Sequence, residues 1–231
     1  MSYLVLVRHG QSQWNKERRF TGWIDVDLTA QGKSEAEYSG KLIKGLNIEF
    51  HKYFTSKLKR ATNTLDLIIK TLDKTRPKII KTYALNERHY GGLTGLNKDE
   101  TIKKYGKKQV QIWRRSFDIC PPPIDSSNPY KNKIHSNISG ESLKDTFNRV
   151  VPYYDKNIKP LIASGKNVLI VFHGNSCRAL LMKIFNISKK KIVNFEIPTG
   201  NPLLIKFKDN LKVENYKYLN VERSKKIPFN I

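Results

Sequence analysis

Segments that read as strands alternate with segments that read as helices along almost the whole chain. Residues 168–172, Val-Leu-Ile-Val-Phe, form a continuous apolar and largely β-branched run of the kind found in central parallel strands. Further strands are expected at 3–7, 53–55 and 78–80. The segments between them carry apolar residues at helical spacing. This alternation predicts an α/β fold in which helices cover both faces of a mostly parallel central sheet.

Capping residues and proline indicate where several helices begin and bend. Thr29 is the expected N-cap of a helix that runs to about residue 46, and Asn97 with Glu100 resembles a capping box before a short helix. Residues 58–72, 110–113 and 141–163 also show helical spacing, and Pro152 is expected to bend or restart the last of these. A helix is expected from about Asn175, and two terminal strands are expected at 203–207 and 212–219.

We expect a single domain over residues 1–231, because the sequence contains no internal repeat, low-complexity tract or flexible linker. Residues 120–139 include four prolines together with several Asn and Ser, which argues against regular structure there. Long segments of this kind are often lids, so a lid loop is expected at about 116–140. A short polar tail is expected after about residue 220.

The chain is strongly basic, with 43 Lys and Arg against 20 Asp and Glu and a formal net charge of +23. Such a charge attracts polyanions, so a basic polyanion-binding protein is one interpretation. The lysines are scattered, however, and no basic ribbon with interspersed aromatic residues appears. This distribution favours a solvated lysine-rich surface, with no specific nucleic-acid partner and no membrane partner.

The N-terminus and the cysteines indicate a cytoplasmic protein. The chain begins Met-Ser-Tyr-Leu-Val-Leu-Val and reaches Arg8 at once, which lacks the pattern of a secretory signal. No apolar run approaches the length of a membrane-spanning helix. Cys120 and Cys177 make neither a CxxC pair nor a disulfide framework, as expected in a reducing compartment.

Two histidines directly follow predicted strands. Arg8-His9-Gly10 comes after the first strand, and His173-Gly174-Asn175 comes after the strand at 168–172. Ligands of open α/β sheets bind beyond the carboxyl ends of the strands, where the N-termini of helices favour anions. The two histidines are therefore expected at one site.

Phosphoryl transfer suits this pair of residues. A neutral imidazole is a nucleophile near neutral pH and can carry a phosphoryl group, while a second imidazole donates hydrogen bonds to its oxygens. Arg8, and Arg60 at the start of a predicted helix, would supply fixed positive charge, so the site needs no metal. Taken singly, each residue also has a purely structural explanation. The hypothesis rests on their combination.

The motifs around these residues resemble a known family. Residues 6–12, Leu-Val-Arg-His-Gly-Gln-Ser, with Trp14-Asn15, resemble the signature of the histidine phosphatase superfamily. The further motifs, in the same order, resemble the 2,3-bisphosphoglycerate-dependent phosphoglycerate mutases, and the similarity runs from about residue 3 to residue 219. These motifs are Arg19-Phe20-Thr21-Gly22-Trp23, Asp25-Val26-Asp27-Leu28, Leu85-Asn86-Glu87-Arg88-His89-Tyr90-Gly91, Gly95-Leu96-Asn97-Lys98, Trp113-Arg114-Arg115 and His173-Gly174-Asn175-Ser176.

The resemblance implies a metal-independent enzyme that interconverts 3-phosphoglycerate and 2-phosphoglycerate in glycolysis and gluconeogenesis, with 2,3-bisphosphoglycerate as the primer. His9 matches the phosphorylated nucleophile and Glu87 the group that donates and accepts protons. Arg8, Arg60 and His173 match the residues that hold the transferring phosphoryl group. The family commonly forms dimers or tetramers, so a homo-oligomer is also implied. The other implied substrate-binding residues are Asn15, Thr21, Gly22, Arg88, His89, Tyr90, Lys98, Arg114, Arg115, Gly174 and Asn175.

One departure from the family pattern leaves an alternative open. The proline-rich stretch between Arg115 and Gly140 is shorter than the corresponding stretch in the family that the motifs resemble. Incomplete closure there would admit water, which competes for the phosphohistidine and would raise phosphatase activity. The alternative function is therefore a phosphatase, or a bisphosphoglycerate phosphatase or synthase, of the same superfamily. Lys98, Arg114 and Arg115 favour the mutase, because they would hold a second anionic group.

Overall fold

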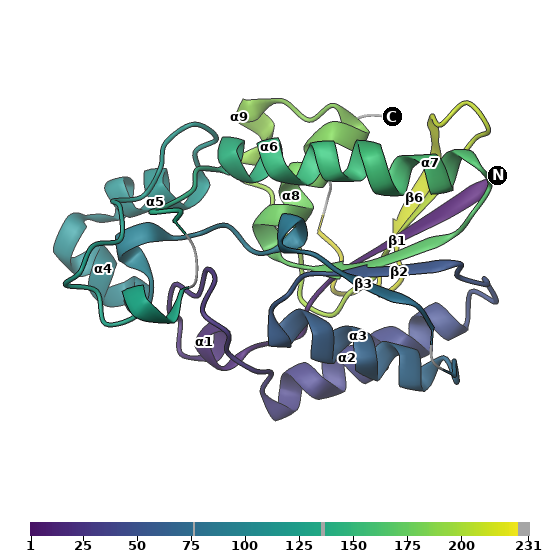
Figure 1. Ribbon diagram of the computed structural model, residues 1–231, viewed down its shortest axis with the longest axis horizontal. Helices are drawn as coiled ribbons and strands as arrows, with labels where there is room; N and C mark the ends of the chain where they lie inside the picture. The colour runs from purple at the N-terminus through teal and green to yellow at the C-terminus, as the bar shows by residue number, and fades with distance from the viewer. Residues whose placement is uncertain (76, 135–136, 226–231) are drawn as a thin grey trace.

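A six-stranded sheet forms the centre of the molecule, in the order β3-β2-β4-β1-β5-β6 (Figure 1). The computed structural model describes residues 1–75, 77–134 and 137–225. Four strands are parallel: β1 (Ser2–Arg8), β2 (Lys52–Thr55), β3 (Ile79–Lys81) and β4 (Val168–Phe172). The last two, β5 (Leu203–Phe207) and β6 (Val213–Tyr218), pair in the antiparallel direction. The predicted mostly parallel sheet is confirmed.

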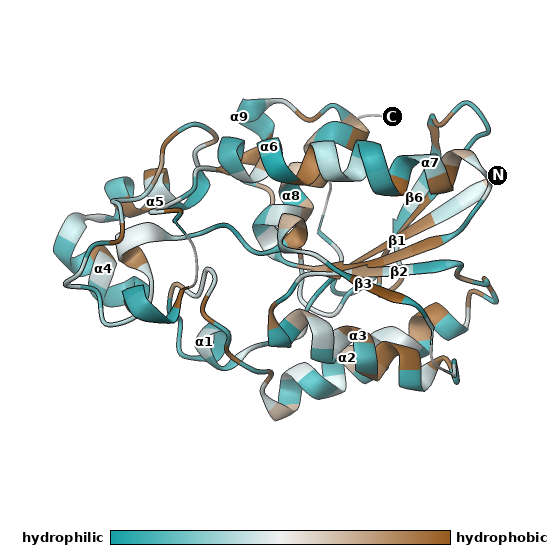
Figure 2. Cartoon of the chain, viewed as in Figure 1, coloured by the Kyte–Doolittle hydropathy of each residue, from teal (hydrophilic) through white to brown (hydrophobic). Residues whose placement is uncertain are grey.

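Helices cover both faces of this sheet (Figure 1). On one face lie α2 (Ala30–Lys44) and α3 (Lys59–Thr71), and on the other lie α6 (Leu143–Tyr153), α7 (Lys159–Ala163) and α8 (Gly174–Phe185). Strand residues alternate between the two layers: Val5 packs with the α2 and α3 side chains, whereas Leu4 packs with those of α6 and α8. Hydrophobic colour is accordingly concentrated on the strands and the inward faces of the helices (Figure 2).

The helix predicted at 141–163 is confirmed from Leu143 onward, and its regular geometry is interrupted just after Pro152, where a bend or restart was expected. It divides into α6, a π-helical segment η4 (Tyr154–Ile158) and α7. Pro152 lies inside α6, where its missing N–H removes one hydrogen bond of the helix, and the wider π turn follows directly. Ser142 caps α6 in a reciprocal capping box with Asp145.

The segments beyond the carboxyl ends of the parallel strands form an outer layer (Figure 1). It contains α1 (Gln13–Lys16), the 3₁₀ turns η1 (Tyr83–Leu85) and η2 (Gly91–Leu93), α4 (Lys98–Tyr105) and α5 (Lys107–Arg115). Asn97 caps α4 as predicted, accepting hydrogen bonds from the backbone of Asp99 and Glu100. The short helix α9 (Lys189–Ile192) follows α8. The sequence patterns did not indicate α1, α9, η1 or η2.

The proline-rich segment is mainly irregular, as predicted, but contains one 3₁₀ turn, η3 (Lys131–Lys133). Its packing ties it to the outer layer, because the backbone of Gly92 donates to the Pro122 carbonyl and the Asn128 side-chain amide donates to the Thr94 carbonyl. Residues 135–136 of the expected lid loop, and residues 226–231 of the expected tail, lie outside the described residues. Within the described ranges no helix combines the length and apolar character needed to cross a membrane.

Candidate active site

A cavity of about 280 Å³ opens where β1 and β4 end. Arg8 and Phe172 are register partners at the ends of these two strands, so the next residues, His9 and His173, emerge side by side. The walls come from the loops after β1, from α3, from the outer layer and from the N-terminal turn of α8. The lining residues are Arg8, His9, Asn15, Arg19, Phe20, Thr21, Arg60, Glu87, Tyr90, Lys98, Arg114, Arg115, Gly174, Asn175, Arg178, Glu196 and Ile197.

His9 is held as a buried, neutral imidazole. Its side chain is 2% exposed, and its Nδ1 lies 2.7 Å from the carbonyl oxygen of Gly10. A carbonyl can only accept, so Nδ1 carries the proton and Nε2 keeps its lone pair. Burial, followed by the charges of Arg60 and Arg8, lowers the pKa of His9 well below its ordinary value. The imidazole is therefore neutral at pH 7, and the lone pair of Nε2 is available for attack.

Close backbone packing fixes the turn that carries His9. A Cβ atom on Gly10 would lie 2.1 Å from the carbonyl oxygen of Gly32, so the start of α2 reaches this turn only because both residues are glycines. Glu35 of α2 adds a polar anchor and accepts a hydrogen bond of 2.9 Å from the backbone N–H of Gln11.

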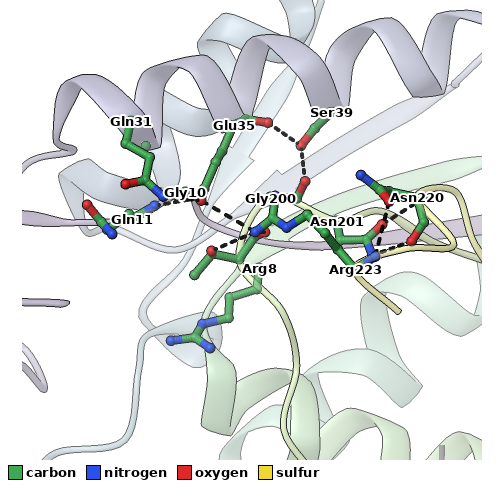
Figure 3. A network of polar contacts seen from close by, with 12 residues as sticks. Arg8, Gly10, Gln11, Gln31, Glu35, Ser39, Gly200, Asn201, Asn220 and Arg223 are labelled. Carbon is green, nitrogen blue, oxygen red and sulfur yellow. Dashed lines mark hydrogen bonds and ion pairs between the residues drawn. The ribbon is translucent and has the colours of Figure 1, made fainter. Parts of the chain in front are cut away.

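Arg223 reaches the same carboxylate from the C-terminal segment (Figure 3). It donates to Glu35 Oε1 at 3.4 Å and to the Thr199 carbonyl at 2.8 Å. The next residue, Gly200, donates its backbone N–H to the Arg8 carbonyl at 2.9 Å. The turn after β1 is thus held by the segments on both sides of it.

His173 packs against His9 without lining the cavity itself. The two ring centroids are 4.9 Å apart in an edge-on arrangement, and His173 is fully buried. Its Nε2 lies 2.8 Å from Ser56 Oγ. Burial, with Arg60 and His9 as further causes, lowers the pKa of His173 well below its ordinary value. A second neutral imidazole therefore stands directly behind the first.

Two arginines supply positive charge at the histidine end. Arg60 is 1% exposed and donates to the carbonyl oxygens of Ile24 and Gly22 at 2.9 and 2.7 Å. Burial lowers the pKa of Arg60 to about 10, which leaves it charged at neutral pH. Arg8 donates to the Ile197 carbonyl at 2.6 Å, and among the described residues its Nε has no partner. Such a free donor suits an anionic ligand.

Glu87 lies at the centre of the cavity wall and is 9% exposed. The backbone N–H groups of Arg88 and Asn175 both donate to its Oε1, at 2.7 and 3.1 Å. The position of a Cβ on Gly174 would be 3.6 Å from Arg8 Nε and 3.8 Å from Glu87 Oε2, so the absent side chain leaves space between these two groups. Glu87 can therefore exchange a proton with a ligand that Arg8 also contacts.

The far end of the cavity is also cationic. Lys98, Arg114 and Arg115 line it, together with Tyr90. Burial lowers the pKa of Lys98 to about 8, with Arg114 adding to the effect. Burial alone raises the pKa of Tyr90, but Arg88, Lys98 and Arg114 outweigh it and the net shift is downward. Arg115 forms an ion pair with Glu196, an acidic residue on the same wall.

The structure brings most of the predicted site residues together. Twelve of them line the cavity: Arg8, His9, Asn15, Thr21, Arg60, Glu87, Tyr90, Lys98, Arg114, Arg115, Gly174 and Asn175.

Four others stand behind this lining. His173 packs on His9, Gly22 accepts from Arg60, Arg88 lies 4.7 Å over the Tyr90 ring, and His89 donates its backbone N–H to Glu141. Within the described residues no group of three or more His, Cys, Asp and Glu side chains could hold a metal ion.

Sequence reasoning missed five lining residues, namely Arg19, Phe20, Arg178, Glu196 and Ile197. Arg178 had a usable signal, since it lies four residues after Gly174 and so on the same face of α8. Arg19 and Phe20 belong to the motif Arg19-Phe20-Thr21-Gly22-Trp23, from which only Thr21 and Gly22 were predicted to bind substrate. Glu196 and Ile197 carry no such signal, because they belong to an irregular segment between α9 and β5.

Comparison with known proteins agrees with this architecture. The model of the histidine phosphatase superfamily (branch 1) matches residues 4–215, so the chain belongs to that superfamily. Curated relatives place it more narrowly. It is 47% identical over 234 residues to a 2,3-bisphosphoglycerate-dependent phosphoglycerate mutase of Hyphomonas neptunium, covering 99% of each chain. It is 49% identical to the protein of that name from Treponema denticola, covering 94% of this chain and 91% of the relative.

Solved structures of the same fold are more distant in sequence. An alpha-ribazole phosphatase from Shigella flexneri superposes with a TM-score of 0.70 at 19% identity, over 99% of this chain and 98% of that one. A mycobacterial glucosyl-3-phosphoglycerate phosphatase gives a TM-score of 0.69 at 19% identity, over 94% and 96% of the two chains. At such identities the likeness concerns the fold alone.

Proposed function

We propose that this chain interconverts 3-phosphoglycerate and 2-phosphoglycerate through a phosphohistidine on His9. One observation carries the proposal: His9, backed by His173, lines one cavity with Arg8 and Arg60, and a second group of cations, Lys98, Arg114 and Arg115, lines the same cavity. A monophosphoglycerate has a phosphate and a carboxylate, and each desolvated anion needs its own donors. The relatives that are 47–49% identical carry the name of this activity.

The His9 end of the cavity performs the phosphoryl transfer. Nε2 of phosphorylated His9 holds the phosphoryl group while the free hydroxyl of the monophosphoglycerate attacks phosphorus. The P–O bond forms as the P–N bond breaks, and the electron pair of that bond returns to Nε2. Arg8 and Arg60 stabilise the charge on the three phosphoryl oxygens, and His173 keeps the His9 ring in place.

Glu87 handles the proton of each transfer. It accepts the hydroxyl proton as the substrate oxygen attacks, and it returns a proton to the oxygen that leaves when the other phosphate moves to His9. The two backbone donors on Oε1 fix the carboxylate, so Oε2 is the oxygen available to the substrate. No phosphate is consumed over the cycle.

The cationic end would hold the second anionic group and so distinguish a mutase from a simple phosphatase. Lys98, Arg114, Arg115 and Tyr90 are placed to bind the carboxylate or second phosphate, together with Asn15 and Thr21. The backbone amide of Gly174 adds a donor at the start of α8, whereas that of Asn175 already donates to Glu87. 2,3-Bisphosphoglycerate, which carries two phosphates and a carboxylate, fits a cavity with two cationic ends and, when bound, supplies the phosphoryl group that loads His9.

The wider setting of the enzyme is also part of the proposal. We propose one catalytic domain over residues 1–231, with the segment 116–140 as a lid, that acts in the cytoplasm as a homo-oligomer without a metal ion. The alternative remains a phosphatase, or a bisphosphoglycerate phosphatase or synthase, of the same superfamily. The alignment with the Hyphomonas relative, which spans 99% of both chains, argues against a large deletion in the lid relative to that protein.

The deciding assay measures conversion of 3-phosphoglycerate to 2-phosphoglycerate with and without catalytic 2,3-bisphosphoglycerate, and with a chelator present throughout. We expect turnover that depends on the bisphosphate and is unaffected by the chelator. His9→Ala should abolish it, whereas Glu87→Gln should still form phosphohistidine but exchange slowly. Release of inorganic phosphate without isomerisation would instead identify a phosphatase. A wild type without turnover, together with polyanion binding that persists in His9→Ala, would favour the basic binding protein.

A further inference from the structure

Arg178 is a buried cation that the proposed reaction does not use. It lies on α8, is 2% exposed and lines the cavity. Among the described residues no carboxylate pairs with it, and its Nε has no hydrogen-bond partner. Burial, with Arg115 and Arg88 nearby, lowers the pKa of Arg178 to about 9. Placing such a charge beside other arginines is unfavourable, so packing alone does not explain the residue.

The contacts of Arg178 fix the orientation of the Asn175 amide. Its Nη1 donates to Asn175 Oδ1 at 2.8 Å, and its Nη2 donates to the Ile192 carbonyl at 2.6 Å. A guanidinium has only donors, so the atom of Asn175 that faces it must be the oxygen. A flipped amide would point its NH₂ group at the guanidinium. Arg178 therefore forces Asn175 Nδ2 to the opposite side.

Asn175 Nδ2 in turn determines how Tyr90 uses its hydroxyl. Nδ2 lies 3.1 Å from Tyr90 Oη, and an amide NH₂ can only donate. Oη is therefore the acceptor of this hydrogen bond, which leaves the hydrogen of Tyr90 for another partner. Tyr90 lines the cavity at its cationic end. The hydroxyl consequently acts as a donor toward an anion in the cavity.

We propose that Arg178 is a positioning residue which, through the Asn175 amide, sets Tyr90 as a hydrogen-bond donor to the second anionic group of the substrate. The inference rests on the proposed function for the identity of that substrate, a phosphoglycerate. The same relay fixes the Asn175 backbone that donates to Glu87. Arg178 thus acts on substrate binding without touching the reacting atoms.

The test is a double-mutant cycle on substrate affinity, which does not require turnover. The dissociation constant of 3-phosphoglycerate is measured by calorimetry for the wild type, Arg178→Met, Tyr90→Phe and the double variant. Loss of the relay should weaken binding about tenfold in either single variant. The double variant should be weakened about as much as Tyr90→Phe alone, because the hydroxyl that Arg178 orients is already gone. If the fold-changes in the dissociation constant of the two single variants multiply in the double variant, the relay is refuted.

Two further variants separate positioning from folding. Arg178→Lys keeps a donor at Asn175 Oδ1 and should bind 3-phosphoglycerate almost as tightly as the wild type. This variant keeps the proposal testable if Arg178→Met fails to fold. Lys183→Met removes a cation from the same helix, one that faces Asp155 at 3.4 Å, and should leave the dissociation constant unchanged. An Arg178→Lys protein that folds but binds as weakly as Tyr90→Phe would also overturn the proposal. If the wild type binds 3-phosphoglycerate but does not isomerise it, the proposed mutase function is contradicted, whereas the relay from Arg178 to Tyr90 is not.

Discussion

Replacing Arg149 by methionine should destabilise the protein strongly, because this guanidinium holds the segment that carries Glu87. Its side chain and that of Glu141 are 11% and 3% exposed, and they join through hydrogen bonds of 2.6 and 2.9 Å. Arg149 also donates to the carbonyl oxygens of Ala84 and Glu87, each at 2.9 Å. Breaking a buried ion pair from one side costs about 3–5 kcal/mol, since the remaining charge is left unpaired.

The measurement is the free energy of unfolding from urea titration at constant pH. Arg149→Met should lower it by about 3–5 kcal/mol, and adding Glu141→Gln should restore about 1–3 kcal/mol because a neutral amide replaces the stranded carboxylate. Arg18→Met is the matched control, since Arg18 pairs with Asp99 at the exposed surface, and the midpoint should hardly move. A double variant no more stable than Arg149→Met would refute the reasoning, because lost packing would then explain the effect.

Three further predictions concern pH, a competing carboxylate and a glycine contact. Burial lowers the pKa values of His9 and His173, and it lowers that of His89 to about 4. Below about pH 6.5 the unfolded chain therefore binds protons that the folded chain does not. Urea titrations should show stability falling as pH drops below that value, and His89→Gln should reduce the slope; a flat profile would contradict the buried neutral histidines. Glu196→Gln should lower the KM for 3-phosphoglycerate about two- to fivefold, because Arg115 no longer pairs with a protein carboxylate; an unchanged KM would mean that this pair does not compete with substrate. Gly10→Ala should destabilise by about 1–3 kcal/mol and impair phosphorylation of His9, because the new Cβ meets the Gly32 carbonyl at 2.1 Å. Gly45→Ala, whose Cβ would have no neighbour closer than 3.6 Å, is the control, and equal effects of the two would exclude the contact as the cause.

The strands and most helices could be predicted because local patterns and tertiary packing agree there. Residues 168–172 are apolar on both faces and form the central strand, and Thr29 caps α2 through the backbone of Gly32. The pattern at 141–163 predicted the helix and a bend at Pro152 but not the π turn that follows, because periodicity records which face is buried, whereas a π turn depends on backbone hydrogen bonds. Short elements such as α1 offer too few residues for a period to appear.

The candidate site divides in the same way. His9 and His173 could be placed together from the rule that parallel strands end at one edge, and the other positions followed from motif resemblance. Neither source separates residues that line the cavity from residues behind it. His89 shows the difference, since its backbone N–H binds Glu141 and its Nδ1 accepts from Gly91, so the ring serves the loop rather than the cavity. Side-chain direction depends on the packed loop, which no local pattern records.

The electrostatics of the cavity indicate what it is built to hold. Arg8, Arg60, Arg114, Arg115, Arg178 and Lys98 line one cavity, and only two carboxylates, Glu87 and Glu196, stand among its lining residues. Burial, followed by repulsion from neighbouring arginines, lowers the pKa values of Lys98 and Arg178 to about 8 and about 9, so their positive charges are less stable in the cavity than in water. A ligand with two or more anionic groups relieves this repulsion, whereas an ester with one phosphate as its only anionic group relieves only part of it. We therefore expect the cavity to prefer phosphoglycerates, which carry more than one anionic group, over simple phosphate esters, and replacing Lys98, Arg114 or Arg115 should weaken that preference before it weakens phosphorylation of His9.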